Sequence, residues 1–112
     1  MNAPQINTAI PKRRYQLGDF AVTVLGEIES GDGQDYRYVL AMVQEGKQEP
    51  CFYVTASKVS ADDYLLRVIA PSLERDLDTG PHWRDLDAFC EQAIDLAQQV
   101  MGLKDEYPHR LM

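Results

Sequence analysis

The sequence lacks most of the features that identify a function directly. Its 112 residues contain only two cysteines, Cys51 and Cys90, and two histidines, His82 and His109, and the cysteines form no CxxC pair. It contains no GxSxG nucleophile motif, no Gly-rich phosphate loop followed by a helix, and no HExxH. These absences leave no motif for a hydrolase, nucleotide-binding or zinc-peptidase site.

Long apolar runs are also missing. No stretch of eighteen apolar residues occurs, so we expect no membrane span. The first residues, MNAPQINTAIPKRR, carry their charges after the mildly apolar part and contain no hydrophobic segment of the secretory kind. We therefore expect a cytoplasmic protein in which residues 1–13, interrupted by Pro4 and Pro11, form a flexible lead-in.

Positive charge is scarce. The net charge is −7, and residues 61–112 hold eleven Asp and Glu against five Lys and Arg. Such a surface repels phosphate backbones, which excludes nucleic acid as the expected partner. The one basic cluster, Lys12–Arg14, is too short for a nucleic-acid patch, and we expect it to dock on the acidic half of the same or another subunit.

Alternation of apolar and polar residues dominates the first two thirds of the chain, which reads as one domain over residues 1–112. It covers residues 20–29, 35–44, 51–57 and 63–70, separated by short turns, with a further edge strand expected at 14–17. Within 20–29 the residues expected on one face are Phe20, Val22, Val24 and Ile28. Because short connections join antiparallel neighbours, residues 14–70 predict an antiparallel β-meander of four to five strands.

The period then changes to that of a helix. After a linker at 71–81, apolar residues recur at helical spacing over 82–102, beginning with Gly80 and Pro81 and ending at Gly102, with 103–112 as a tail. The fold class predicted is α+β, with the meander packed against one long C-terminal amphipathic helix. The residues expected on its apolar side are Trp83, Leu86, Phe89, Cys90, Ala93, Ile94, Leu96, Ala97, Val100 and Met101.

One helix covers only one face of such a sheet. The strands at 35–44 and 63–70 are nevertheless apolar on both sides, so the second face needs a cover. The candidates are a second copy of the chain, the lead-in folding over, an apolar ligand, a partner protein, or curling of the sheet on itself. A homodimer is the commonest solution, and we expect it here.

Tyrosines supply the candidate binding residues. The alternation places Tyr36 and Tyr38 on one face with Met42, while Tyr53 and Tyr64 lie on neighbouring strands. Such clusters line ligand pockets and protein interfaces, although tyrosine is also an ordinary strand residue. These five residues form the predicted interface or pocket.

Metal and covalent chemistry are not indicated. His82, Asp85 and Cys90 share one stretch, but their spacing matches no zinc pattern, and the acidic residues of 74–78 lack the glycine and glutamate of a calcium loop. Either cysteine with His82 or His109 could form a catalytic dyad, but both cysteines fall where core residues are expected. We assign no catalytic residue, metal or cofactor, and expect two reduced thiols, with a sheet-to-helix disulfide as the alternative.

The function expected is that of a non-enzymatic protein interaction module, adaptor- or chaperone-like, dimeric through the uncovered sheet face. The alternative is a small-ligand-binding domain with a Tyr-lined pocket between sheet and helix. A small enzyme comes third.

Overall fold

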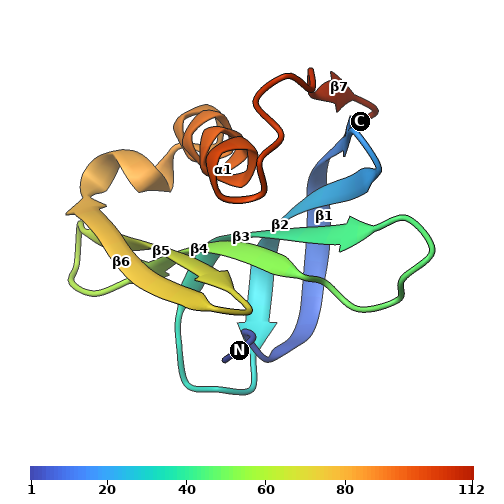
Figure 1. Ribbon diagram of the computed structural model, residues 1–112. Coiled ribbons are helices and arrows are strands. Elements are labelled where there is room, and N and C mark those ends of the chain that lie inside the picture. Colours follow the sequence, from blue (N-terminus) through green and yellow to red (C-terminus); the bar gives the residue numbers. More distant parts are fainter.

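The computed structural model describes residues 1–112 as one antiparallel sheet, a short 3-10 turn and one helix (Figure 1). The sheet has seven strands in the order β6-β5-β4-β3-β2-β1-β7. The predicted α+β class, with a meander followed by a C-terminal helix, is confirmed. The elements are β1 (Ile6–Leu17), β2 (Phe20–Ser30), β3 (Tyr36–Gln44), β4 (Phe52–Lys58), β5 (Tyr64–Ala70), β6 (Leu73–Gly80), η1 (Pro81–Arg84), α1 (Leu86–Val100) and β7 (His109–Arg110).

The predicted count of four to five strands is wrong. Strand β1 begins at Ile6, within the expected lead-in, β6 fills most of the expected linker at 71–81, and β7 lies in the expected tail. Both β6 and most of β1 lie at the edge of the sheet, where few side chains need burial. An edge strand also tolerates Pro11, because its outward side needs no N–H donor. Neither strand therefore carries the apolar alternation that a sequence pattern detects.

The predicted long helix over 82–102 is also wrong. Residues 81–84 form the 3-10 turn η1, and Asp85 is extended, with φ −84° and ψ 128°. The Asp85 carboxylate accepts a hydrogen bond from the Ala88 N–H at 2.9 Å, so Asp85 is the N-cap of the fifteen-residue helix α1. The expected C-terminal cap is confirmed, since Gly102 has φ 68° and the Leu103 N–H donates to the Gln98 carbonyl at 2.8 Å.

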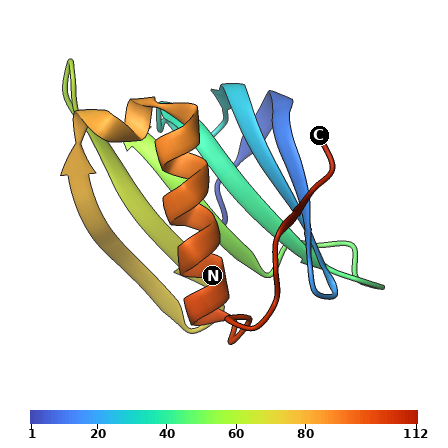
Figure 2. The same ribbon diagram turned by 90° about the horizontal axis from the view of Figure 1, so that it is seen from above.

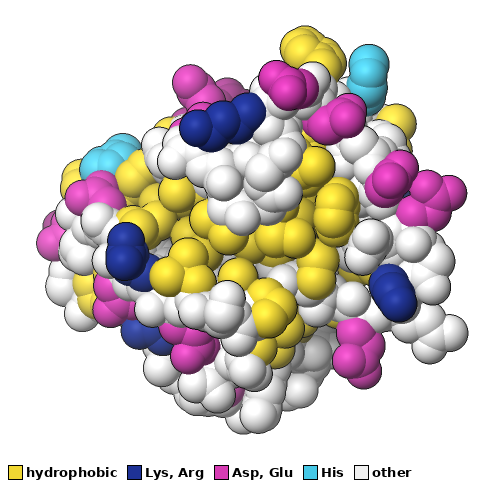
Figure 3. Space-filling model, viewed as in Figure 1, with side chains coloured by type: hydrophobic (Ala, Val, Ile, Leu, Met, Phe, Trp, Pro, Cys, Tyr) yellow, Lys and Arg dark blue, Asp and Glu magenta, His cyan; other side chains and the backbone are white.

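Helix α1 packs across one face of the sheet (Figure 2). Phe89, Ala93 and Ala97 are fully buried against strand residues, and the Phe89 ring lies 5.4 Å from that of Tyr38. Where α1 ends, hydrophobic side chains reach the surface between helix and sheet (Figure 3). The partly buried residues that pack against this core include Phe20, Cys51, Leu73, Met101 and Leu103.

Two β-bulges move predicted residues from one face to the other. Ile10 pairs with Gly26 but Thr8 pairs with Glu29, so β2 holds an extra residue beside Glu27, whose φ is 48°. Arg37 is the extra residue in β3, between the pairs Tyr36–Ser57 and Tyr38–Ala56. An inserted residue reverses the alternation beyond it. Ile28 and Tyr36 therefore do not share the face of Val24 and Tyr38, as predicted, but pack on the opposite face.

That opposite face, called the second face below, is the one that α1 does not cover. Val39, Tyr53 and Ile69 form a small cluster there and are 0%, 8% and 4% exposed in the single chain. Ile6, Ile28, Tyr36 and Ala41 pack around them. The bulged ends of β1 and β2 extend below the level of β3 to β5, close to the N-terminus (Figure 1). Part of the apolar second face is thus buried without any partner.

Phe89 gives the packing of α1 a direct test. We expect Phe89→Ala to lower the free energy of unfolding by about 3–5 kcal/mol, because it removes a fully buried ring and leaves a cavity. Val100→Ala on the same helix is the control, with an expected loss of no more than about 0.5 kcal/mol, since Val100 is exposed. Urea unfolding followed by circular dichroism measures both. Equal losses would contradict the packing described.

Candidate functional site: a cavity on the second face

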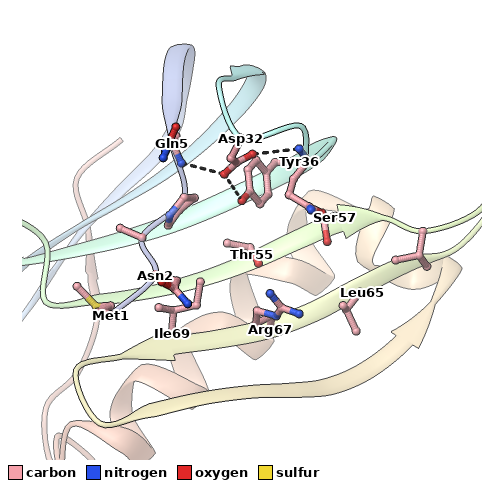
Figure 4. Close-up of a pocket in the computed structure, with 14 residues that line it drawn as sticks. Met1, Asn2, Gln5, Asp32, Tyr36, Thr55, Ser57, Leu65, Arg67 and Ile69 are labelled. Carbon is pink, nitrogen blue, oxygen red and sulfur yellow. Dashed lines mark hydrogen bonds between the residues drawn. The ribbon is translucent and has the colours of Figure 1, made fainter.

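A cavity of about 650 Å³ opens on the second face (Figure 4). Its floor comes from two adjacent strands, with Thr55 and Ser57 on β4 and Leu65, Arg67 and Ile69 on β5. These residues share a face because Thr55 pairs with Arg67 and Ser57 pairs with Leu65 in the β4–β5 register. The floor therefore combines two hydroxyls, one guanidinium and two apolar side chains.

Residues 1–5, called the strap below, cross this cavity. The backbone N–H and side-chain amide of Asn2 donate to the Glu74 carboxylate on β6, at 3.2 and 3.3 Å. At the other end the Gln5 N–H donates to Asp32 Oδ2 at 3.0 Å, and the Gln5 carbonyl accepts from the Gly31 N–H at 2.8 Å. The strap thus lies over the cavity, anchored to β6 at Asn2 and to the loop after β2 at Gln5, and Figure 4 shows the Gln5–Asp32 anchor.

Asp32 is the fixed negative charge at one rim. Burial acts to raise the pKa of its carboxyl group, but hydrogen bonds from the Gln5 N–H, the Tyr36 hydroxyl and the Gln34 N–H together lower it. Burial, and then the neighbouring Asp32 carboxylate, raise the pKa of Tyr36. At neutral pH, Asp32 is therefore an ionised acceptor and Tyr36 a protonated donor, with 2.7 Å between their oxygens.

Arg67 is the only cationic side chain that lines the cavity. Its Nε donates to Asp76 Oδ1 at 2.6 Å, and this hydrogen bond is the main cause of a raised pKa for the guanidinium. The guanidinium points into the cavity below Tyr36 (Figure 4). Asp32 and Arg67 are the only charged side chains that line the cavity, and the carboxylates of Glu74 and Asp76 lie beside it, so carboxylates outnumber cationic side chains at this site.

The lining side chains define the chemistry that the cavity offers. The residues that line the cavity include no histidine and no cysteine, so the Thr55 and Ser57 hydroxyls have no imidazole base beside them. No group of three or more His, Cys, Asp or Glu side chains in the chain is placed to hold a metal ion. What the cavity offers is hydrogen-bond donors from its floor and acceptors from its rims.

The five residues of the predicted interface or pocket lie on both faces of the sheet. Tyr36 lines the cavity and Tyr53 lies beside it in the small apolar cluster, whereas Tyr38 and Met42 are buried under α1. Tyr64 packs at the margin of the same core as Tyr38. The region between sheet and helix is occupied by this core, and the cavity lies on the other side of the sheet.

Sequence reasoning missed the floor and the strap. The available signal was Arg67 within the apolar strand 63–70, on the same alternating side as Leu65 and Ile69. The residues that it did not single out are Asn2, Gln5, Asp32, Thr55, Ser57, Leu65, Arg67 and Ile69.

The stretch that contains His82, Asp85 and Cys90 links β6 to α1. The Trp83 indole N–H donates to Asp78 Oδ2 at 3.0 Å, and His82 Nε2 lies 3.0 Å from the same oxygen. Asp85 caps α1 and Cys90 points into the core, so neither lies with His82 in a ligand set. These contacts fasten η1 to β6 and place the start of α1.

The basic cluster Lys12–Arg14 belongs to β1. Lys12 forms an ion pair with Glu27 beside the bulge, and Arg13 forms one with Asp87 in the first turn of α1. Of this cluster only Arg13 docks on the acidic half, within the same chain, where its ion pair ties β1 to the helix.

Both cysteines are free, so the alternative of a sheet-to-helix disulfide is wrong. Burial raises the pKa of both thiols: Cys90 is buried on the core side of α1, and Cys51 is half-buried just before β4. The chain also has no helix with the length and apolar character needed to cross a membrane.

Comparison with known proteins gives no assignment: no family model, no curated protein sequence and no solved structure matches the chain.

Thiol reactivity tests the burial of Cys51 and Cys90. We expect both to react slowly with Ellman's reagent in the native protein at about pH 8, because a raised pKa leaves little thiolate, and to react faster as the pH rises. Cys51→Ser should leave Cys90 unreactive until denaturant is added. Rapid native release of one equivalent by that variant would contradict the burial of Cys90.

Proposed function

We propose that this protein is a non-enzymatic interaction module, adaptor- or chaperone-like, that binds a segment of a partner polypeptide in the cavity of the second face. The observation that carries the proposal is the strap. Five residues of polypeptide already cross the cavity, held by amide groups of Asn2 and Gln5 that donate to the carboxylates of Glu74 and Asp32. A surface that accepts this segment has the shape and hydrogen-bonding groups for another one.

The edges of the sheet support this choice of surface. Edge strand β6 is rich in charge and carries a bulge at Leu77. Edge strand β1 contains Pro11 and three register shifts, and β7 pairs with its last part. Charge, proline and bulges all discourage addition of a strand at an edge. A partner is therefore expected on the second face.

A homodimer through the second face is less favoured by this geometry. Its central apolar residues are already buried within one chain, so a second copy would bury little further apolar surface there. We propose a different polypeptide as the partner. Light scattering tests the dimer directly, since the chain has a mass of 12.7 kDa.

A small polar molecule in the same cavity is the second candidate. Its volume of about 650 Å³ falls within the range of small-molecule sites, about 300–1,000 Å³. A metabolite that raises the melting temperature of the full chain, with no peptide bound, would favour this candidate.

Two leucines on neighbouring strands provide the test of peptide binding. Leu65 lines the cavity and Leu77 is exposed at the β6 bulge outside it, so Leu65→Lys and Leu77→Lys add the same charge at different places. We expect decapeptides selected from a random display library on the full chain to bind Leu65→Lys at least about tenfold more weakly, equivalent to about 1.4 kcal/mol. Leu77→Lys should bind them as the unmodified chain does.

Fluorescence anisotropy of the selected peptides gives the affinities, and thermal unfolding verifies that both variants are folded. Equal affinity for the two variants, or no selectable peptide, would contradict the proposal.

A further inference from the structure

The hydrogen bonds of the strap indicate which chemical groups the cavity accepts. Its two anchored N–H groups, on Asn2 and Gln5, donate to carboxylates at opposite rims. Between these rims the floor presents Arg67, Thr55 and Ser57, whose donors suit the carbonyl oxygens of an extended chain. The complementary ligand is thus a polypeptide segment in extended form, with amide donors toward the rims and carbonyls toward the floor.

The charge of the cavity narrows the ligand further. Three carboxylates, those of Asp32, Glu74 and Asp76, lie at or beside the cavity, against the single guanidinium of Arg67, which is paired with Asp76. The strap MNAPQ brings no charged side chain, and its one positive group is the α-amino group of Met1, so removal of the strap leaves the carboxylates in excess. Lysine or arginine side chains near Asp32 and Glu74 would form hydrogen bonds in which donor and acceptor are both charged, whereas in those of the strap amides only the carboxylate is charged.

The strap and such a segment exclude each other. Met1, Ala3 and Pro4 line the same cavity, and the Asn2 and Gln5 donors occupy the carboxylates that a partner needs. The strap itself is weakly held, since Met1, Asn2, Ala3 and Gln5 are exposed and its hydrogen bonds are open to water.

We infer that the partner is an extended basic segment of polypeptide and that the strap is a built-in competitor that this segment must displace. The inference rests on the proposed function. The fraction of molecules with the strap released then sets the apparent affinity, because only that fraction is competent to bind.

Asn2 allows the strap to be weakened without a change of charge. Asn2→Ala removes the side-chain bond to Glu74, and Asn2→Pro removes that bond and the backbone N–H donor as well. Asn7→Ala is the matched control, because Asn7 is an exposed asparagine of β1 outside the strap. All variants are full-length, and none touches the folded core on the other face.

The probes are three labelled decapeptides that alternate threonine with lysine, glutamine or glutamate, measured by fluorescence anisotropy at low and moderate salt. We expect affinity in the order lysine, glutamine, glutamate, with a lysine preference that weakens as salt rises. For the lysine peptide we expect Asn2→Ala to tighten binding about twofold and Asn2→Pro about five- to tenfold, with Asn7→Ala unchanged.

The possible failures are distinguishable. If peptides bind and Leu65→Lys weakens them while Asn2→Pro leaves affinity unchanged or lowers it, the competing strap is wrong and the proposed function stands. If the glutamate peptide binds best, the basic partner is wrong. If no peptide binds the unmodified chain or Asn2→Pro, both the inference and the proposed function fail.

Discussion

The structure depends on one constraint: a single helix of fifteen residues must bury the apolar side of a six-strand meander, and it reaches only one face. Phe89, Ala93 and Ala97 complete the core on that face, and the Asp85 cap and the Trp83–Asp78 contact determine where the helix begins. The opposite face receives no helix. The cavity and the strap that crosses it both lie on this second face.

Two β-bulges help to bury part of this second face. By reversing the alternation, the extra residues beside Glu27 and at Arg37 bring Ile28 and Tyr36 to the second face, where they pack around Val39 and its neighbours. A bulge also bends its strand and increases its twist. The loop between β2 and β3, which carries Asp32 and Gln34, and the strap before β1 come to wall one side of the cavity. The same local irregularities that bury the apolar cluster also create the recess beside it.

The sequence predicted those strands in which apolar and polar residues alternate. Strands β2 to β5 and the Gly102 cap were predicted to within about one residue, because their side chains divide cleanly between core and solvent. Strands β1 and β6 were missed because edge strands need no such division. The face predicted for Tyr36 was wrong because Arg37, the extra residue of the bulge, has the sequence pattern of an ordinary outward-facing strand residue. The cavity floor escaped notice because Thr55 and Arg67 meet only through the β4–β5 register, which single-strand patterns do not contain.

The sheet also separates stability from binding, residue by residue. In β5, Leu66 and Val68 belong to the core under α1, while Leu65 and Arg67 line the cavity. Neighbouring positions in one strand therefore serve different purposes, and a change in the cavity removes no packing from the main core. The strap lies on the binding side of this division, so its release costs a few exposed hydrogen bonds and leaves the helix face intact. A competitor held in this way can respond to a partner without unfolding the domain that carries it.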